Sequence, residues 1–410
     1  MLSSDKTLQI QLLGTFDVRN YGDLLFPLVA ATRLAPYGIE VSAVSPTDVG
    51  TGWTPYQPTA FRNILNARRP VDGVLIGGGN IIHAGPANLR DYAIGDMGDW
   101  AYASLWMGAT VAAAIRNVPV LWNAPGVPRQ VPDSITRHVA FRQMLQAADY
   151  VSVRDAASAS HLGEYPDVTI HVVPDTAADL ARVWSVEQLA DTFATLLQRK
   201  AILPGGRYFA VHAKARSVGN VSREALAGEI EAFAQRHALT PILIALGPCH
   251  EDDVYARQLS RHLRHPHVLM DDPLGVEEIA AVISQATAYV GSSLHGYITS
   301  AVYGVPSLLV AEPKLPKFPG FLKHIGRSED LCDGWTEAFA QADSLMRRQA
   351  AQTYIPPEIT AQLDAHWDRI ATLYLKPPSS MVARTRFLRS FVQRSIESGG
   401  WSWALRNALE

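Results

Sequence analysis

Short apolar runs alternate along this chain with longer segments of helical periodicity, and this alternation restricts the fold more than any other feature. The runs are Leu8–Leu13, Ile39–Val44, Val71–Ile76, Val118–Trp122, Tyr150–Val153, Val168–Val173, Tyr208–His212, Ile242–Leu246, His267–Met270, Ala288–Val290 and Ser307–Val310. Strands that alternate with helices are typical of parallel sheets covered by helices on both faces. The sequence therefore predicts an α/β protein.

The alternation pauses once, near residues 180–205, and then restarts. A helical stretch over Val186–Arg199 and the turn Leu203–Gly206 occupy the pause. A chain of 410 residues also exceeds the size at which one hydrophobic core usually keeps growing. We therefore predict two Rossmann-like doubly wound domains that face a cleft, over residues 1–185 and 200–350. C-terminal helices and a basic tail follow over residues 356–410.

The composition argues against several kinds of partner. A net charge of −3 lacks the basic excess of a nucleic-acid-binding domain. Cys249 and Cys332 are the only cysteines, too few for a disulfide framework, and the histidines show no metal-site spacing. No uncharged apolar run approaches the roughly 18 residues that span a bilayer. We expect a cytoplasmic protein without a metal, with a peripheral position at the inner membrane face as the alternative.

The segment Ala286–Pro306 carries the clearest signal of a functional site. It reads as a buried strand, a turn of small residues that presents His295, and a short helix. The N–H groups at such a helix start attract anions, and a histidine ring titrates near neutral pH. Ser292, Ser293 and Gly296 would let a phosphate approach the backbone. The alternatives are a core histidine and a plain tight turn.

Polar residues and glycines also follow other predicted strands, at the sheet edge where α/β proteins bind ligands. These candidates are Asn20, Asp23, Gly78, Gly79, Asn80, Arg154 and Asp175 in the first domain, and His212, Lys214 and Arg216 in the second. The cations among them favour an anionic ligand. Structural alternatives exist: Asp23 suits a helix N-cap, the glycines suit a bare turn, and Arg154 suits an exposed ion pair with Asp155.

Four segments give the chain a resemblance to the polysaccharide pyruvyltransferase family. They are Gly14–Asp23, Leu75–Asn80, Val151–Asp155 with Val173–Asp175, and the His295 segment before Gly304-Val-Pro306. They occur in the order of the family's motifs and together span roughly residues 8–310. One position departs from the family's pattern, because Ser293 stands where an Arg often precedes Leu-His.

The resemblance implies a GT-B-like fold and transfer of a pyruvyl group to a sugar of a surface glycan or its precursor. Phosphoenolpyruvate would be the donor substrate, with no separate cofactor. His295 and Asp23 would then be catalytic, and the other residues named above would bind substrate. Lys214 or Arg216 would supply the charge that Ser293 lacks. A glycosyltransferase that uses a sugar nucleotide and a non-catalytic glycan-binding relative are the alternatives.

The C-terminal tail, residues 381–410, differs from the rest in holding five Arg and only two Glu. At helical spacing, one face carries Phe387, Leu388, Phe391, Val392 and Ile396, while Arg384, Arg386 and Arg394 can occupy the other. A basic amphipathic helix followed by Trp401 and Trp403 suits an anionic membrane that presents acceptor lipids. Contact with the protein body or with another subunit is the alternative.

Overall fold

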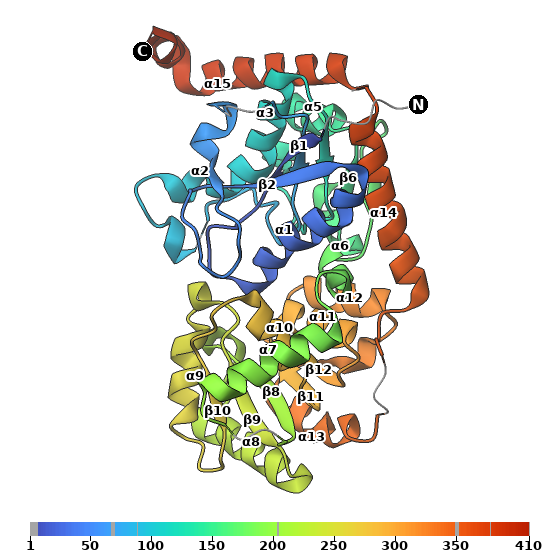
Figure 1. Cartoon of the computed structure of the whole chain (residues 1–410). Coiled ribbons are helices and arrows are strands. Elements are labelled where there is room, and N and C mark those ends of the chain that lie inside the picture. Colours follow the sequence, from blue (N-terminus) through green and yellow to red (C-terminus); the bar gives the residue numbers. More distant parts are fainter. Residues whose placement is uncertain are drawn as a thin grey trace.

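The computed structural model describes residues 7–66, 70–87, 89–202, 205–348, 352–377 and 379–409. Two parallel sheets, each flanked by helices, lie one above the other in the view of Figure 1. A long pair of helices at the C-terminus runs back along the molecule (Figure 1). The predicted α/β class, with two Rossmann-like halves and a C-terminal helical region, is therefore confirmed.

The first sheet contains the strands β1 (Leu8–Leu13), β2 (Ile39–Ser45), β3 (Thr59–Ala60), β4 (Gly73–Ile76) and β5 (Val120–Trp122). Their order is β3-β2-β1-β4-β5 and all pairs are parallel. A bridge between Leu121 and Tyr150 connects the β5 edge to the parallel pair β6 (Val151–Val153) and β7 (Ile170–Val172). The α-helices of this half are α1 (Tyr21–Leu34), α2 (Met97–Ala103), α3 (Ala109–Arg116), α4 (Asp133–Thr136), α5 (Val139–Ala147) and α6 (Ala156–Leu162).

The second sheet contains the strands β8 (Tyr208–His212), β9 (Thr240–Ile244), β10 (Val268–Met270), β11 (Ala288–Gly291), β12 (Ser307–Val310) and β13 (Leu331–Cys332). Their order is β10-β9-β8-β11-β12-β13, again all parallel. The helices around it are α7 (Val186–Arg199), α8 (Arg223–His237), α9 (Asp252–Ser260), α10 (Val276–Ser284), α11 (Leu294–Val302), α12 (Lys317–His324) and α13 (Trp335–Leu345). Helix α7 packs on α10 and so belongs with the second sheet, although it precedes β8.

The sequence pattern missed two strands, β3 and β13. Each has two residues and lies at an edge of its sheet. A strand of two residues shows no periodicity that distinguishes it from a loop. The interior strands were visible because a parallel sheet is covered on both faces, so that all four residues of β4 and all five of β8 are buried.

Helix α14 (Pro357–Leu375) returns from the second half of the molecule and packs against the first (Figure 1). Its Trp367 indole donates to Asp179 Oδ2 at 2.9 Å, and its Tyr374 hydroxyl donates to the Val74 carbonyl at 2.8 Å. Both side chains are nearly fully buried. The C-terminal part of the chain therefore stabilises the N-terminal half.

Helix α15 (Met381–Leu409) lies across α3 and α5 at the outer edge of the first half and is broken at Gly400, whose φ is 80° (Figure 1). Phe387 enters the core of this half. Arg384 does so as well: it is buried and binds Asp149 at 2.8 Å. The expectation that Arg384 occupies a solvent face is wrong, because Asp149 offers a buried counter-charge. None of the described helices is long and apolar enough to cross a membrane.

We predict that Arg384→Ala lowers the free energy of unfolding by about 3 kcal/mol, because it leaves the buried Asp149 carboxylate without its partner. Arg386→Ala, on the exposed side of the same helix, should change it by less than about 0.5 kcal/mol. Urea denaturation followed by circular dichroism compares the two variants. Equal stabilities would show that the buried ion pair does not anchor α15.

Candidate active site

The first turn of α1 is inserted against the second half of the molecule. The Tyr21 N–H donates to the Leu246 carbonyl at 2.8 Å, and the Tyr21 hydroxyl lies 2.7 Å from Thr299 Oγ1 on α11. Nearby, the Val276 N–H donates to the Trp53 carbonyl at 3.2 Å. These contacts bring the carboxyl ends of the two sheets together and form the seam in which most of the predicted site residues lie.

His295, in the first turn of α11, crosses this seam. Its ring packs so closely against Gly22 that a Cβ on Gly22 would lie 1.8 Å from Nδ1, and it meets the edge of Phe26 at a centroid distance of 5.6 Å. His295 Nε2 lies 3.6 Å from Asp175 Oδ2 and has no hydrogen-bond partner among the described residues. The ring is thus fixed by packing, with its Nε2 buried and facing the Asp175 carboxylate.

Asp175 lies behind His295 and is almost fully buried. Its Oδ1 accepts from the Ala177 N–H at 3.1 Å, and its Oδ2 lies 3.5 Å from Arg154 Nη1. Burial alone would raise the pKa of Asp175, but the interactions with His295 and Arg154 hold it below its usual value. Asp175 is therefore a buried carboxylate that contacts both His295 and Arg154, and its role in substrate binding stays a prediction.

Arg154 follows β6 and is also buried, so the exposed ion pair considered from the sequence is wrong. Its guanidinium donates to Asn80 Oδ1 at 2.9 Å and lies 3.5 Å from Asp155, which caps α6 through the Ser158 N–H. Gly126 leaves room for the guanidinium, because a Cβ there would approach it to 2.6 Å. Asn80, Asp155 and Asp175 thus hold the Arg154 guanidinium in one orientation, and Asn80 accepts its hydrogen bond.

Asp23 lies in the first turn of α1 but is not its N-cap, because Asn20 holds that position. Asp23 Oδ2 accepts from Thr15 Oγ1 at 2.8 Å and from Asn20 Nδ2 at 2.9 Å. Burial raises the pKa of Asp23, and the neighbouring His295 opposes that rise. The structure therefore places a carboxyl of raised pKa beside the imidazole, as a proton acceptor requires.

The predicted site glycines lie in close packing contacts. A Cβ on Gly78 would lie 2.2 Å from the Phe26 ring, and one on Gly296 would lie 2.2 Å from the Tyr289 hydroxyl. Gly79 has a φ of 83°, which favours glycine, and a Cβ there would lie 2.8 Å from Asp23. Packing therefore already requires glycine at these three positions, and their contact with a ligand stays a prediction.

Three further candidates, His212, Ser292 and Ser293, form hydrogen bonds with residues next to the seam. His212 is fully buried, with Nε2 at 2.8 Å from Asp252, and burial lowers its pKa. Ser292 is buried and donates to Ser217 at 2.8 Å, while the Ser293 hydroxyl caps α11 by accepting from the Gly296 N–H at 3.3 Å. The side chains of His212 and Ser292 are both buried, and their contact with substrate stays a prediction.

A cluster of cations lines the seam: Arg154, Lys214, Arg216 and Lys317. Burial, together with the charges of Arg154, Lys214 and Arg216, lowers the pKa of Lys317 to about 7. Within the described ranges, no salt bridge forms on Lys214, Arg216 or Lys317. A small pocket between Asn80, Arg154 and Lys317 opens on this cluster. Unpaired like charges at close range favour an anionic ligand.

The sequence analysis missed Lys317 and His250. Lys317 begins α12, just beyond the carboxyl end of β12, and His250 follows β9. Burial and the charges of Lys214 and Arg216 lower the pKa of His250 to about 3, so the His250 ring is neutral at pH 7. The only available signal was their position after a strand, since neither lies in a recognisable motif. Nowhere in the described chain are three His, Cys, Asp or Glu side chains grouped to hold a metal ion.

Comparison with known sequences identifies the family. The sequence model of the family described as polysaccharide pyruvyl transferase matches residues 20–312, which include Asp23, Arg154, Asp175 and His295. The chain therefore belongs to this family and is a transferase. No curated protein matches the sequence.

Several solved structures are similar in fold. They are Staphylococcus aureus MnaA solved with UDP (13% identity, TM-score 0.53, covering 91% of this chain and 99% of that one), a putative UDP-N-acetylglucosamine 2-epimerase from Listeria monocytogenes (12%, 0.55, 91% and 99%) and UDP-GlcNAc 2-epimerase from Methanocaldococcus jannaschii (11%, 0.53, 89% and 99%). At these identities the likeness concerns the fold alone, which is GT-B-like across almost the whole chain.

We predict that Gly22→Ala reduces transferase turnover by about 10²-fold, because the new methyl group displaces the His295 ring from Asp23 and Asp175. Gly228→Ala is the matched control, since Gly228 lies in α8 with open space around its Cα. This control should retain turnover and gain slightly in stability. Steady-state kinetics of both variants tests the prediction, and unchanged turnover in Gly22→Ala would contradict the assigned role of His295.

Proposed function

We propose that this transferase moves a pyruvyl group from phosphoenolpyruvate to two hydroxyls of one sugar, in a surface glycan or its precursor. The cluster of Arg154, Lys214, Arg216 and Lys317 beside His295 carries this proposal. Phosphoenolpyruvate bears a phosphate and a carboxylate close together, and cations from both halves of the molecule match that charge. The family match over residues 20–312 supports the same reaction class.

The reaction that we propose forms a cyclic ketal. The enol methylene carbon gains a proton, the bond from the central carbon to the phosphate oxygen breaks, and two sugar hydroxyl oxygens bond to that carbon. Of the two hydroxyl protons, one is balanced by the new methyl C–H and the other leaves with the phosphate. The reaction therefore needs no oxidant or further reactant, only proton transfer and stabilisation of charge.

In this proposal His295 delivers the proton to the methylene carbon. Its Nε2 has no hydrogen-bond partner among the described residues, and the Asp175 carboxylate 3.6 Å away stabilises the protonated ring. Asp23, whose pKa is raised by burial, accepts a proton from a sugar hydroxyl. Ser293 carries no charge and caps α11, so in this proposal Lys214, Arg216 and Lys317 supply the positive charge that the family's pattern would place there as an Arg.

A sugar nucleotide is the alternative donor. Staphylococcus aureus MnaA was solved with UDP, and the Methanocaldococcus jannaschii epimerase was solved with UDP-GlcNAc and UDP. A diphosphate would suit the same four cations, and the fold is shared. This alternative would make the protein a glycosyltransferase, with the acceptor sugar in the same seam.

Donor class is tested by incubating the protein with glycan acceptors and either phosphoenolpyruvate or a panel of sugar nucleotides. We expect phosphate release and a product heavier by one pyruvyl ketal with phosphoenolpyruvate alone, and His295→Ala should lower this turnover by about 10²–10⁴-fold. A product that gains a sugar would favour the glycosyltransferase. Absence of turnover with every donor would favour a glycan-binding protein.

The cation cluster also predicts a pH dependence of donor binding. Lys317 has a pKa of about 7 in the free protein, and a bound anion raises that pKa. Above about pH 7, binding must therefore be coupled to proton uptake, so phosphoenolpyruvate affinity should fall as the pH rises from 7 to 9. Lys317→Arg stays charged and should abolish most of this fall.

Calorimetric titrations at several pH values measure both affinity and proton uptake. Lys317→Ala should weaken binding by about 10–100-fold at pH 6.5, the cost of one charge-assisted contact. Lys323→Ala, on the exposed side of the same helix, is the control and should bind like the unaltered protein. Identical pH profiles for the unaltered protein and Lys317→Arg would exclude Lys317 from the donor site.

A further inference from the structure

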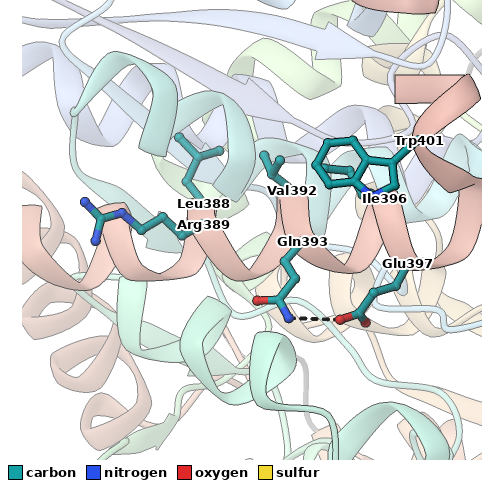
Figure 2. A pocket seen from close by; sticks show the side chains of 7 residues that line it. All are labelled: Leu388, Arg389, Val392, Gln393, Ile396, Glu397 and Trp401. Carbon is teal, nitrogen blue, oxygen red and sulfur yellow. Dashed lines mark hydrogen bonds between the residues drawn. The ribbon is translucent and has the colours of Figure 1, made fainter. Parts of the chain in front are cut away.

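An apolar groove runs along the outer side of α15, separate from the seam. Its lining comes from α15 alone: Leu388, Arg389, Val392, Gln393, Ile396, Glu397 and Trp401. In the view of Figure 2, Leu388, Val392 and Trp401 lie above the helix ribbon and Gln393 and Glu397 below it, and these two rows together line the groove. The break at Gly400 turns the chain so that Trp401 stands at the end of the groove (Figure 2).

This groove lies on a different face of α15 from the one that holds the helix to the body. Arg384 and Phe387 are fully buried, and Phe391 and the partly buried Leu388 pack against the core, so these residues already have partners; Leu388 also borders the groove. In contrast, Val392 is 47% exposed and Trp401 67% exposed. Apolar side chains that recur every four residues on an exposed face indicate an interaction surface.

The charges on α15 argue against an anionic membrane as the occupant. Of the Arg residues expected on the polar face, Arg384 is buried against Asp149, and Arg394 lies 3.7 Å from Glu397. In the described part of α15, Arg386 and Arg389 are then the exposed Arg side chains that have no acidic partner. Polybasic membrane-binding segments use four to eight clustered cations, so this remaining charge is small.

We propose instead that the groove binds α15 of a second copy of this chain, with the two helices antiparallel and a two-fold axis near Val392 and Gln393. Arg389 and Glu397 stand equally far from Gln393 on either side. An antiparallel pair therefore places Arg389 beside Glu397 of the partner subunit, and the symmetric contact repeats this pair. Opposite charges thus meet on both sides of the axis.

The apolar residues follow the same symmetry. Leu388 and Ile396 stand equally far from Val392, so Leu388 packs against Ile396 of the partner subunit, and Val392 lies at the axis. The straight segment from Met381 to Gly399 is about 28 Å long at 1.5 Å per residue. Two helices of this length make a small interface, so we expect dimerisation to depend on protein concentration in the micromolar range.

Sedimentation velocity of the full chain at several concentrations tests the proposal. We expect a monomer–dimer equilibrium in which Val392→Asp raises the dissociation constant at least about tenfold, because two copies of the change meet at the axis. Arg386→Asp is the matched control on the same helix and should leave the equilibrium unchanged. Both positions are exposed, so the variants should fold, which circular dichroism and turnover verify.

A charge exchange tests the register itself. Arg389→Glu and Glu397→Arg should each weaken the dimer, because each places like charges together twice, whereas the double variant should restore it. Flotation with phosphatidylserine vesicles accompanies each measurement. A chain that is monomeric at all concentrations, a double variant no better than the single ones, or a monomer that binds vesicles would each overturn the proposal.

Discussion

The close contact between Gly22 on α1 and the His295 ring on α11 determines the geometry of the candidate site. His295 belongs to the second half of the chain, whereas Asp23 and Asp175 belong to the first, so the three meet only when both helix starts abut. Tyr21 fixes that register through its bonds to Leu246 and Thr299, both buried. A change of about 1 Å between the halves would separate the imidazole from its carboxylates. The geometry of the candidate site therefore depends directly on how the two halves of the molecule are arranged.

The cations of the seam differ in whether a carboxylate neutralises them. Arg154 is neutralised by Asp155 and Asp175 and is oriented by Asn80, so it keeps its place whether or not a ligand is bound. Lys317 and its neighbours Lys214 and Arg216 form no salt bridges within the described residues, and burial together with the neighbouring positive charges lowers the pKa of Lys317. A bound anion would offset this repulsion. A bound anionic donor would thus neutralise the positive charges that no carboxylate of the described residues pairs with.

The sequence revealed the strands and the loops of the site, but not which side chains face the ligand. Parallel strands are apolar throughout, so their runs are visible without tertiary information. The roles of Gly78 and Gly296 depend on Phe26 and Tyr289, whose rings approach them only in the folded chain. His212 ends a strand just as the other candidates follow theirs, and only the folded chain shows that its ring is fully buried against Asp252. Which residues of a strand-end loop face the seam is a tertiary property, invisible to local pattern.

The same limit explains the tail. The sequence analysis assigned Phe387 and Arg384 to opposite faces, yet both are buried, because Asp149, 235 residues earlier, supplies a buried carboxylate to the Arg384 guanidinium. With Arg384 buried and Arg394 beside Glu397, only Arg386 and Arg389 are exposed and unpaired in the described part of α15, and we infer that this face suits a symmetric helix partner better than a lipid surface. Since α15 rests on α3 and α5 of the first half, pairing through it adds no restraint on the second half. The halves then stay free to adjust about the seam, where His295 and the cations must meet their substrate.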